Sequence, residues 1–138
     1  MERRVEEYFP KVLEITEKVF SDDIKNGGIP SEYKGYISTF GTMIIQNGIL
    51  PALAYYEKND SNTKGDRVKL IEVIKRFLLQ KDEMFKNVKK KDAKLVEIVK
   101  DEVKNGNDFD REKLRIIEDK IIDISIALKL SLRTYLEV

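Results

Sequence analysis

The chain has 138 residues, of which 41% are hydrophobic and 37% are charged. This is enough apolar side chain for one folded domain and far too much for a disordered tail. Its 26 lysines and arginines nearly balance its 25 aspartates and glutamates, so the net charge of +1 indicates no class of partner. The absence of cysteine and histidine excludes disulfides, cysteine nucleophiles and the commonest metal ligand. We therefore expect a single helical domain over residues 1–138, with no cofactor and no metal.

Apolar residues recur at helical spacing in the first half of the chain. A first amphipathic stripe covers residues 5–19, and the turn-forming residues 26–30 follow it. The pattern predicts a second helix over residues 31–47, which Gly48 ends. Pro51 then lies in the first turn of a third helix, where its missing N–H costs nothing.

The second half of the chain continues the same periodicity. Asp66 is a predicted cap for a fourth helix, whose apolar stripe covers residues 70–78. A lysine-rich connector at residues 86–91 precedes a fifth helix predicted over residues 92–103. The last helix is expected to begin at Asp108 or Asp110 and carries a heptad pattern to the end of the chain.

No stretch alternates with period two for long enough to indicate a strand. The sequence therefore predicts an all-α fold: a single compact bundle of about six helices, in which the long N- and C-terminal helices frame a short uncharged central pair. That pair includes residues 35–56, which carry no charge. Their polar content and the break at Asn47-Gly48 favour two short buried helices over one membrane span. Because the N-terminus also lacks the apolar run of a signal peptide, we expect a cytoplasmic protein without membrane contact.

Residues 64–91 hold ten lysines or arginines and four acids, a local charge of +6 that leaves −5 for the rest of the chain. A basic ridge of this kind neutralises phosphates well. Lysine runs are, however, more often plain solvated surface. The connector has no aromatic residues between its lysines, so any nucleic-acid contact is expected with the backbone and not with the bases.

The sequence offers few residue patterns for metal binding or catalysis. Glu118, Asp119 and Asp123 could hold a cation, but salt bridges with Arg115 and Lys120 are the commoner use of such spacing. There is no histidine to activate a serine or threonine nucleophile. We therefore predict a protein that is not an enzyme and has no small-molecule substrate.

Residues 33–56 contain a distinctive pattern. The chain reads YKGY, then FGTMIIQNGI, then LAYY. This resembles the small helical subunit of type III-B CRISPR effector complexes, the fifth and smallest subunit of the Cmr complex. Ile49 replaces the leucine usual in that family, and Gly41 stands where a proline is common. The residues that carry the motif, which we expect in the core, are Tyr33, Phe40, Ile44, Ile45, Asn47, Gly48, Leu53 and Tyr55.

The resemblance implies a non-catalytic, structural subunit of an RNA-guided interference complex in antiviral defence. In that family, several copies stack along a filament of a larger backbone subunit, and their basic faces line the channel that holds guide RNA and target RNA. The implied partners are the backbone subunit, the other Cmr subunits, neighbouring copies of the chain, and guide and target RNA. The residues expected to contact RNA are Lys34, Lys64, Arg67, Lys69, Lys75, Arg76, Lys81, Lys86, Lys89, Lys90, Lys91 and Arg133.

An alternative is a helical protein–protein adaptor with no nucleic-acid role. The heptad of the last helix could pair with a partner helix, and the lysines would then only be solvated. A small metal-binding or catalytic bundle ranks last, because histidine and cysteine are missing.

Overall fold

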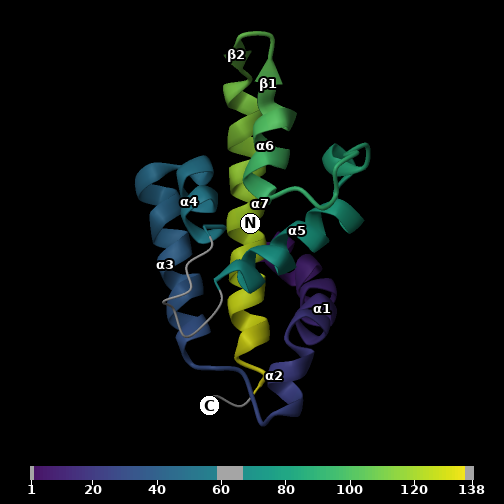
Figure 1. The fold of residues 1–138 in the computed structure, drawn as a ribbon, viewed down its shortest axis with the longest axis vertical. Coiled ribbons are helices and arrows are strands. Elements are labelled where there is room, and N and C mark those ends of the chain that lie inside the picture. Colours follow the sequence, from purple (N-terminus) through teal and green to yellow (C-terminus); the bar gives the residue numbers. More distant parts are fainter. Residues whose placement is uncertain (1, 59–66, 136–138) are drawn as a thin grey trace.

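The computed structural model describes residues 2–58 and 67–135, and the side chains of Glu2 and Arg3 are not among the described groups. The predicted cap Asp66 and the predicted RNA-contacting residue Lys64 lie outside these residues, as does the end of the heptad at Val138. Within the described ranges, the elements in chain order (Figure 1) are α1 (Glu2–Val19), α2 (Ser21–Lys25), α3 (Glu32–Asn47), α4 (Ile49–Tyr56), α5 (Val68–Lys81), the 3₁₀ helix η1 (Glu83–Phe85), α6 (Leu95–Val103), β1 (Lys104–Asn105), β2 (Asp108–Phe109) and α7 (Arg111–Leu132).

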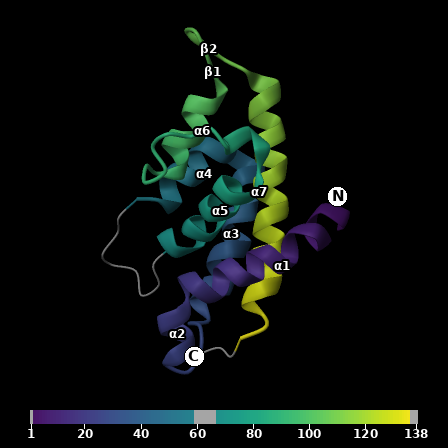
Figure 2. The same ribbon diagram turned by 90° about the vertical axis from the view of Figure 1, so that its right-hand side faces the viewer.

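The compact helical bundle is confirmed, and α7 is its central helix. Figure 1 shows α7 between α3 and α4 on one side and α1 and α5 on the other. Its main contacts are with α1, and it also packs against α3, α5 and α6. Figure 2 shows α1 crossing α7 obliquely, so the two long helices pack together without framing the central pair. The reason is that α7 buries residues on more than one face, including Ser125 and Ala127, which point in nearly opposite directions.

The central pair, α3 and α4, forms one side of the molecule and buries only one face. Tyr33, Phe40, Ile44 and Leu53 are buried, as expected for the motif. The prediction that the whole motif lies in the core is wrong for three residues, because Ile45 is 80% exposed, Tyr55 is 47% exposed and Asn47 is also exposed. Neighbouring positions on a helix point about 100° apart, so the adjacent residues Ile44 and Ile45 cannot both face the same core.

Two helices receive their N-terminal caps from carboxylates that are distant in sequence. The backbone N–H of Ile49 at the start of α4 donates to Glu118 Oε2 on α7, at 3.0 Å. At the start of α6, the N–H groups of Leu95 and Val96 donate to Glu57 Oε2 at 2.6 Å and Oε1 at 2.8 Å. Such bonds satisfy donors that a helix leaves unpaired. Because Glu57 provides the cap, α6 begins at Leu95 and not at residue 92, where we predicted its start.

A small hairpin closes one end of the molecule, between α6 and α7. Lys104 and Asn105 of β1 pair with Phe109 and Asp108 of β2 in antiparallel register, and Gly106 turns the chain with φ of 65°. The sequence analysis predicted no strand, because two-residue strands are too short to show an alternating pattern. Figure 1 places the hairpin at the tip beyond the start of α7. Among the described helices, none is long and apolar enough to cross a membrane.

Candidate nucleic-acid interface

The predicted RNA-contacting residues centre on α5 and the connector that follows it. One face of α5 is buried in the bundle through residues such as Leu70, Ile74 and Leu78. Helical periodicity then places its charged residues toward the rim and the solvent. The structure separates the predicted cations into several distinct environments, which differ in how much charge they leave available for a phosphate.

At the start of α5, Arg67 contacts a cluster of tyrosines. Its guanidinium carbon lies 4.8 Å from the centre of the Tyr55 ring and 5.8 Å from the rings of both Tyr36 and Tyr56. These are cation–π distances. The Tyr56 hydroxyl donates to the Tyr36 carbonyl at 2.6 Å, and burial raises the pKa of Tyr56 to about 12, so this hydroxyl stays protonated as a donor. The exposed ring of Tyr55 and Arg67 together form a mixed aromatic and cationic surface.

Two further α5 cations have carboxylate partners. Lys69 Nζ lies 2.9 Å from Asp23 Oδ2 on α2 and 5.5 Å from the centre of the Phe20 ring. Arg76 Nε lies 2.7 Å from Glu72 Oε2, one turn earlier on the same helix. We predicted Lys69 and Arg76 as a shared ridge of cations, but each is locally neutralised by its partner. Their attraction for a phosphate is reduced accordingly.

The remaining α5 lysines differ from each other. Lys75 is half-buried, and its ammonium donates to the backbone carbonyl of Ala93 at 2.9 Å. It thus holds the segment between the connector and α6 against α5, and the structure gives it a positioning role. Lys81 is exposed near the end of the helix, beside Asp82.

The connector presents the most accessible group of cations. Lys89, Lys90 and Lys91 are exposed, and within residues 2–58 and 67–135 none of them has a carboxylate at ion-pair distance. Lys86 is also exposed and pairs with Glu83 at 3.1 Å. Lys94, which the sequence analysis did not include, is exposed at the N-cap of α6 and continues this series. The signal was present, since Lys94 lies only three residues beyond the basic region that we delimited.

One groove beside the connector is mixed in charge. It has a volume of about 450 Å³ and lies between the connector and α6. Its α6 wall carries the carboxylates of Glu97, Asp101 and Glu102. Lys89 and Lys90 line the same groove from the connector side, so a phosphate inside it would meet both ammonium groups and carboxylates. The carboxylates therefore weaken the attraction for an anion inside the groove, and of the three lysines 89–91 it is Lys91 that does not line it.

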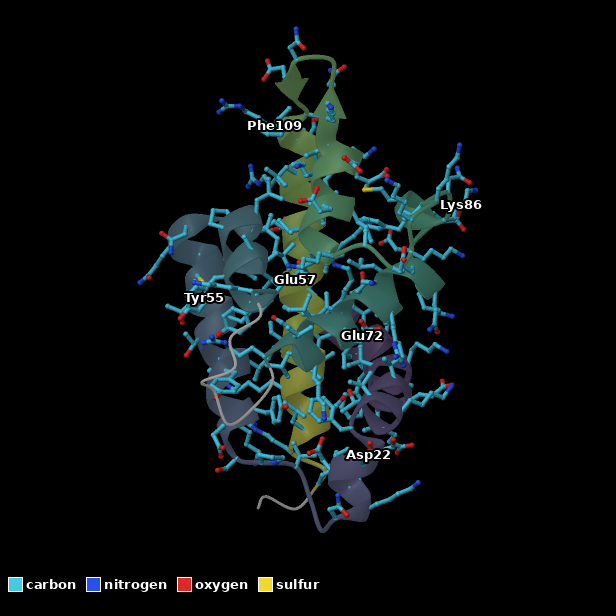
Figure 3. The ribbon with its side chains drawn as sticks, viewed as in Figure 1. Asp22, Tyr55, Glu57, Glu72, Lys86 and Phe109 are labelled. Carbon is cyan, nitrogen blue, oxygen red and sulfur yellow. The ribbon has the colours of Figure 1, made fainter. Side chains whose placement is uncertain are left out.

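The predicted set does not form one continuous face. Figure 3 shows Lys86 and Tyr55 on opposite sides of the molecule, so the connector lysines lie far from the Arg67 cluster. Lys34 is half-buried in the first turn of α3, and Arg133 is exposed at the C-cap of α7. Neither residue belongs to α5 or to the connector.

The carboxylates that we considered for a metal have other contacts. Glu118 caps α4 through Ile49, as described above, and Asp123 Oδ2 lies 2.9 Å from Arg4 Nε. Burial raises the pKa of Asp123. Among the described residues, there is no group of three or more acidic side chains placed to hold a metal ion.

Comparison with known proteins gives one result. The sequence profile of a family described as "CRISPR-associated protein (Cas_Cmr5)" matches residues 2–118. The match covers most of the chain and includes the motif at residues 33–56, the basic helix α5 and the connector. No curated protein and no solved structure gives a significant match.

Proposed function

The chain belongs to the Cas_Cmr5 family of CRISPR-associated proteins, and from this membership we propose that it is a non-catalytic small subunit of a type III-B Cmr complex that contacts guide or target RNA. Family membership supports a role as one subunit of a Cmr complex. The RNA contact is the part that we argue from the structure. It would take place in the cytoplasm, where the RNA-guided complex meets its target.

We assign the RNA contact to the exposed lysines of the connector. The observation that carries it is the set of exposed lysines Lys89, Lys90 and Lys91, which lack a carboxylate partner among the described residues. Unpaired, exposed ammonium groups exchange their counterions for phosphates, which drives backbone binding and makes it salt-dependent. The contact carries no sequence information, because phosphates are common to every sequence. That suits a subunit that must accept any guide.

The test is charge reversal of the connector with a matched control. Lys89→Glu/Lys90→Glu/Lys91→Glu should weaken binding of single-stranded RNA and of an RNA duplex to a similar extent, measured by fluorescence anisotropy. The slope of log K against log salt should fall by about two to three, since each phosphate contact contributes roughly 0.7–0.9. The control is the triple reversal of Lys18, Lys25 and Lys104, exposed lysines on α1, α2 and β1 that change the net charge by the same amount.

If the control variant loses as much affinity as the connector variant, only bulk charge matters and the assigned surface is wrong. Reversal of Lys69 is a poorer test, because it also breaks the ion pair with Asp23 that joins α5 to α2.

The alternative of a helical adaptor without an RNA role has one observation in its favour. Ile45 on α3 is 80% exposed, which is unusual for a large apolar side chain. Association with other Cmr subunits at high salt and without RNA, combined with no RNA binding by the chain, would favour the adaptor.

A further inference from the structure

A half-exposed aromatic ring lies at the tip of the molecule. Phe109 in β2 is 50% exposed (Figure 3), and within residues 2–58 and 67–135 no other aromatic ring packs against it. The hairpin carries it beyond the start of α7, away from the core of the bundle (Figures 1 and 2). One exposed apolar side chain needs no explanation by itself. The groups that surround this ring give it a specific use.

The ring lines a pocket where α6 meets the hairpin, which we call the hairpin pocket. It has a volume of about 350 Å³, within the range of about 300–1,000 Å³ that is usual for ligand sites. Two lysines, one acid and one aromatic ring contribute to its lining, which consists of Lys100, Lys104, Gly106, Asn107, Asp108 and Phe109. The charge of the lining is therefore positive.

The register of the hairpin places a cation beside the ring. Lys104 of β1 pairs directly with Phe109 of β2. Residues that are directly opposite in an antiparallel pair share one face of the ribbon, with their Cβ atoms about 4.5–5.5 Å apart. Lys104 is exposed and has no carboxylate at ion-pair distance in the part of the chain that the structure describes. Lys100 contributes less charge, because its Nζ lies 3.2 Å from Glu97 Oε2.

The acidic groups at the tip already accept hydrogen bonds from the backbone. Asp108 Oδ1 accepts from the N–H of Phe109 at 2.8 Å. Asp110 Oδ1 accepts from the N–H of Lys113 at 3.0 Å, and this residue does not line the hairpin pocket. Asp108 is thus the one acid of the lining, and it offsets one of the two lysines.

We propose that the hairpin pocket binds an unpaired nucleotide of an RNA strand, with the base stacked on Phe109 and the adjoining phosphate at Lys104. Bases of every kind stack on exposed aromatic side chains, and a neighbouring ammonium group neutralises the phosphate. A base inside a duplex cannot stack in this way, because its neighbours cover both of its faces. The inference rests on the proposed function in that the chain meets RNA, and it adds a contact with a base to the phosphate contacts of the connector.

The first test uses the fact that the chain has no tryptophan. Phe109→Trp places the protein's only tryptophan in the hairpin pocket, where a stacked base quenches the indole fluorescence. We expect quenching by a short single-stranded RNA, and much weaker quenching by the same RNA paired with its complement. Inorganic polyphosphate, which has charge but no bases, should leave the fluorescence unchanged.

The matched control is Ile126→Trp. Ile126 is 43% exposed, lies about 22 Å along α7 from its start and does not line the hairpin pocket, so a tryptophan there should not respond. Equal quenching at positions 109 and 126, equal quenching by the duplex, or no quenching at position 109 would overturn the proposal. Quenching by adenosine monophosphate at lower concentrations than by RNA would assign the pocket to a free nucleotide and overturn it as well.

The second test separates stacking from charge and from plain apolar contact. Phe109→Leu keeps an apolar side chain but removes the ring, so it should weaken binding of single-stranded RNA about fivefold or more, the loss expected for one base–aromatic stack. Phe109→Tyr keeps the ring and should bind like the wild type. Neither substitution changes the charge, so the slope of log K against log salt should not change. Wild-type affinity in the leucine variant would contradict the proposal and leave the ring to a protein partner.

Failure of this inference and failure of the connector assignment are distinguishable by the salt dependence. Reversal of Lys89, Lys90 and Lys91 lowers the slope, whereas Phe109→Leu lowers the affinity at an unchanged slope. Lys104 is also one of the three lysines reversed in the connector control, so that control should lose about one phosphate contact, against two to three for the connector variant. Wild-type affinity of Phe109→Leu with a lowered slope in the connector variant would count against the hairpin pocket alone. The converse result would count against the connector alone.

Discussion

At the scale of single residues, Gly48 joins α3 to α4 through a backbone conformation that other residues rarely adopt. Its φ is 90° and its ψ is 166°. An added Cβ would meet nothing closer than Glu118 Oε2 and Pro51 Cδ, both at 4.0 Å. The requirement for glycine here is therefore conformational and does not come from crowding.

This gives a paired prediction. Gly48→Ala should lower the free energy of unfolding by about 1–3 kcal/mol, the usual cost of a strained backbone position. Gly35→Ala, inside α3 where an added Cβ meets nothing within 4 Å, should instead raise it by about 0.5–1 kcal/mol through helix propensity. Urea unfolding followed by circular dichroism measures both. A neutral Gly48→Ala would show that the turn relaxes.

The candidate site shows how far single residues could be read from the sequence. Charge counting correctly found an exposed lysine group, because a run of four lysines in six residues cannot be buried. It could not foresee that Lys69 meets Asp23, 46 residues earlier, or that Arg67 lies over Tyr55. Such contacts depend on which helices become neighbours, and that information lies in the packing.

At the scale of the elements, the caps of α4 and α6 link three parts of the bundle. Glu57 is the C-cap residue of α4 and is 7% exposed, and its carboxylate binds two backbone N–H groups at the start of α6. Glu118 on α7 caps α4 in the same way. The positive end of each helix thus meets a carboxylate from another element, which stabilises both.

Removing the carboxylate that caps α6 should lower the stability of the folded protein. Glu57→Ala leaves the N–H groups of Leu95 and Val96 without their partner, and we expect a loss of about 2 kcal/mol or more in the free energy of unfolding. The control is Glu97→Ala, an exposed residue in the first turn of the same helix, which should change it by less than about 0.5 kcal/mol. Chemical denaturation at neutral pH measures the free energy of unfolding of both variants and of the wild type. Similar losses would mean that the cap contributes little.

Element boundaries were predictable where local signals fix them. Asn47-Gly48 marked the end of α3, and Asp110 marked the start of α7 through its bond to Lys113 N–H. The start of α6 was not predictable, because its cap comes from Glu57, 38 residues away from Leu95. The order of the helices could be read from periodicity, whereas the central position of α7 could not.

At the scale of the whole molecule, an ion pair between Arg4 and Asp123 connects the two longest helices, α1 and α7. Arg4 Nε lies 2.9 Å from Asp123 Oδ2, and the Asp123 side chain is only 9% exposed. The contact lacks hydrogen-bond geometry at that oxygen. Burial, the largest cause, raises the pKa of Asp123 above its ordinary value of 3.8, although Arg4 opposes the shift.

The sign of this shift gives a pH dependence. A raised pKa means that the folded state binds the proton more tightly than the unfolded state, so the contribution of Asp123 to stability is fully present below pH 3.8 and is lost as the pH rises through the folded pKa. Asp123→Asn removes this loss. The unfolding free energy of the wild type minus that of the variant should therefore fall as the pH rises across this range.

Glu14 provides a control with the opposite sign. A hydrogen bond from Lys11 lowers the pKa of Glu14, so its contribution is present above its ordinary pKa of 4.5 and is lost as the pH falls. For Glu14→Gln, the unfolding free energy of the wild type minus that of the variant should rise with pH. The rise should be small or absent, since this side chain is exposed. Denaturant unfolding across pH 3 to 7 measures both variants, and a rising difference for Asp123→Asn would contradict the assignment.

The long-range caps also have a consequence for how the chain acquires its structure during synthesis. The bond between Ile49 and Glu118 joins residues that are 69 positions apart, and the bond between Leu95 and Glu57 joins residues that are 38 positions apart. The entropy of closing such loops must be offset before either cap can form. Until Glu118 has left the ribosome, the start of α4 has no partner for its first N–H. We therefore expect nascent chains that end before α7 to remain accessible to proteases and chaperones, and protection to appear in one late step.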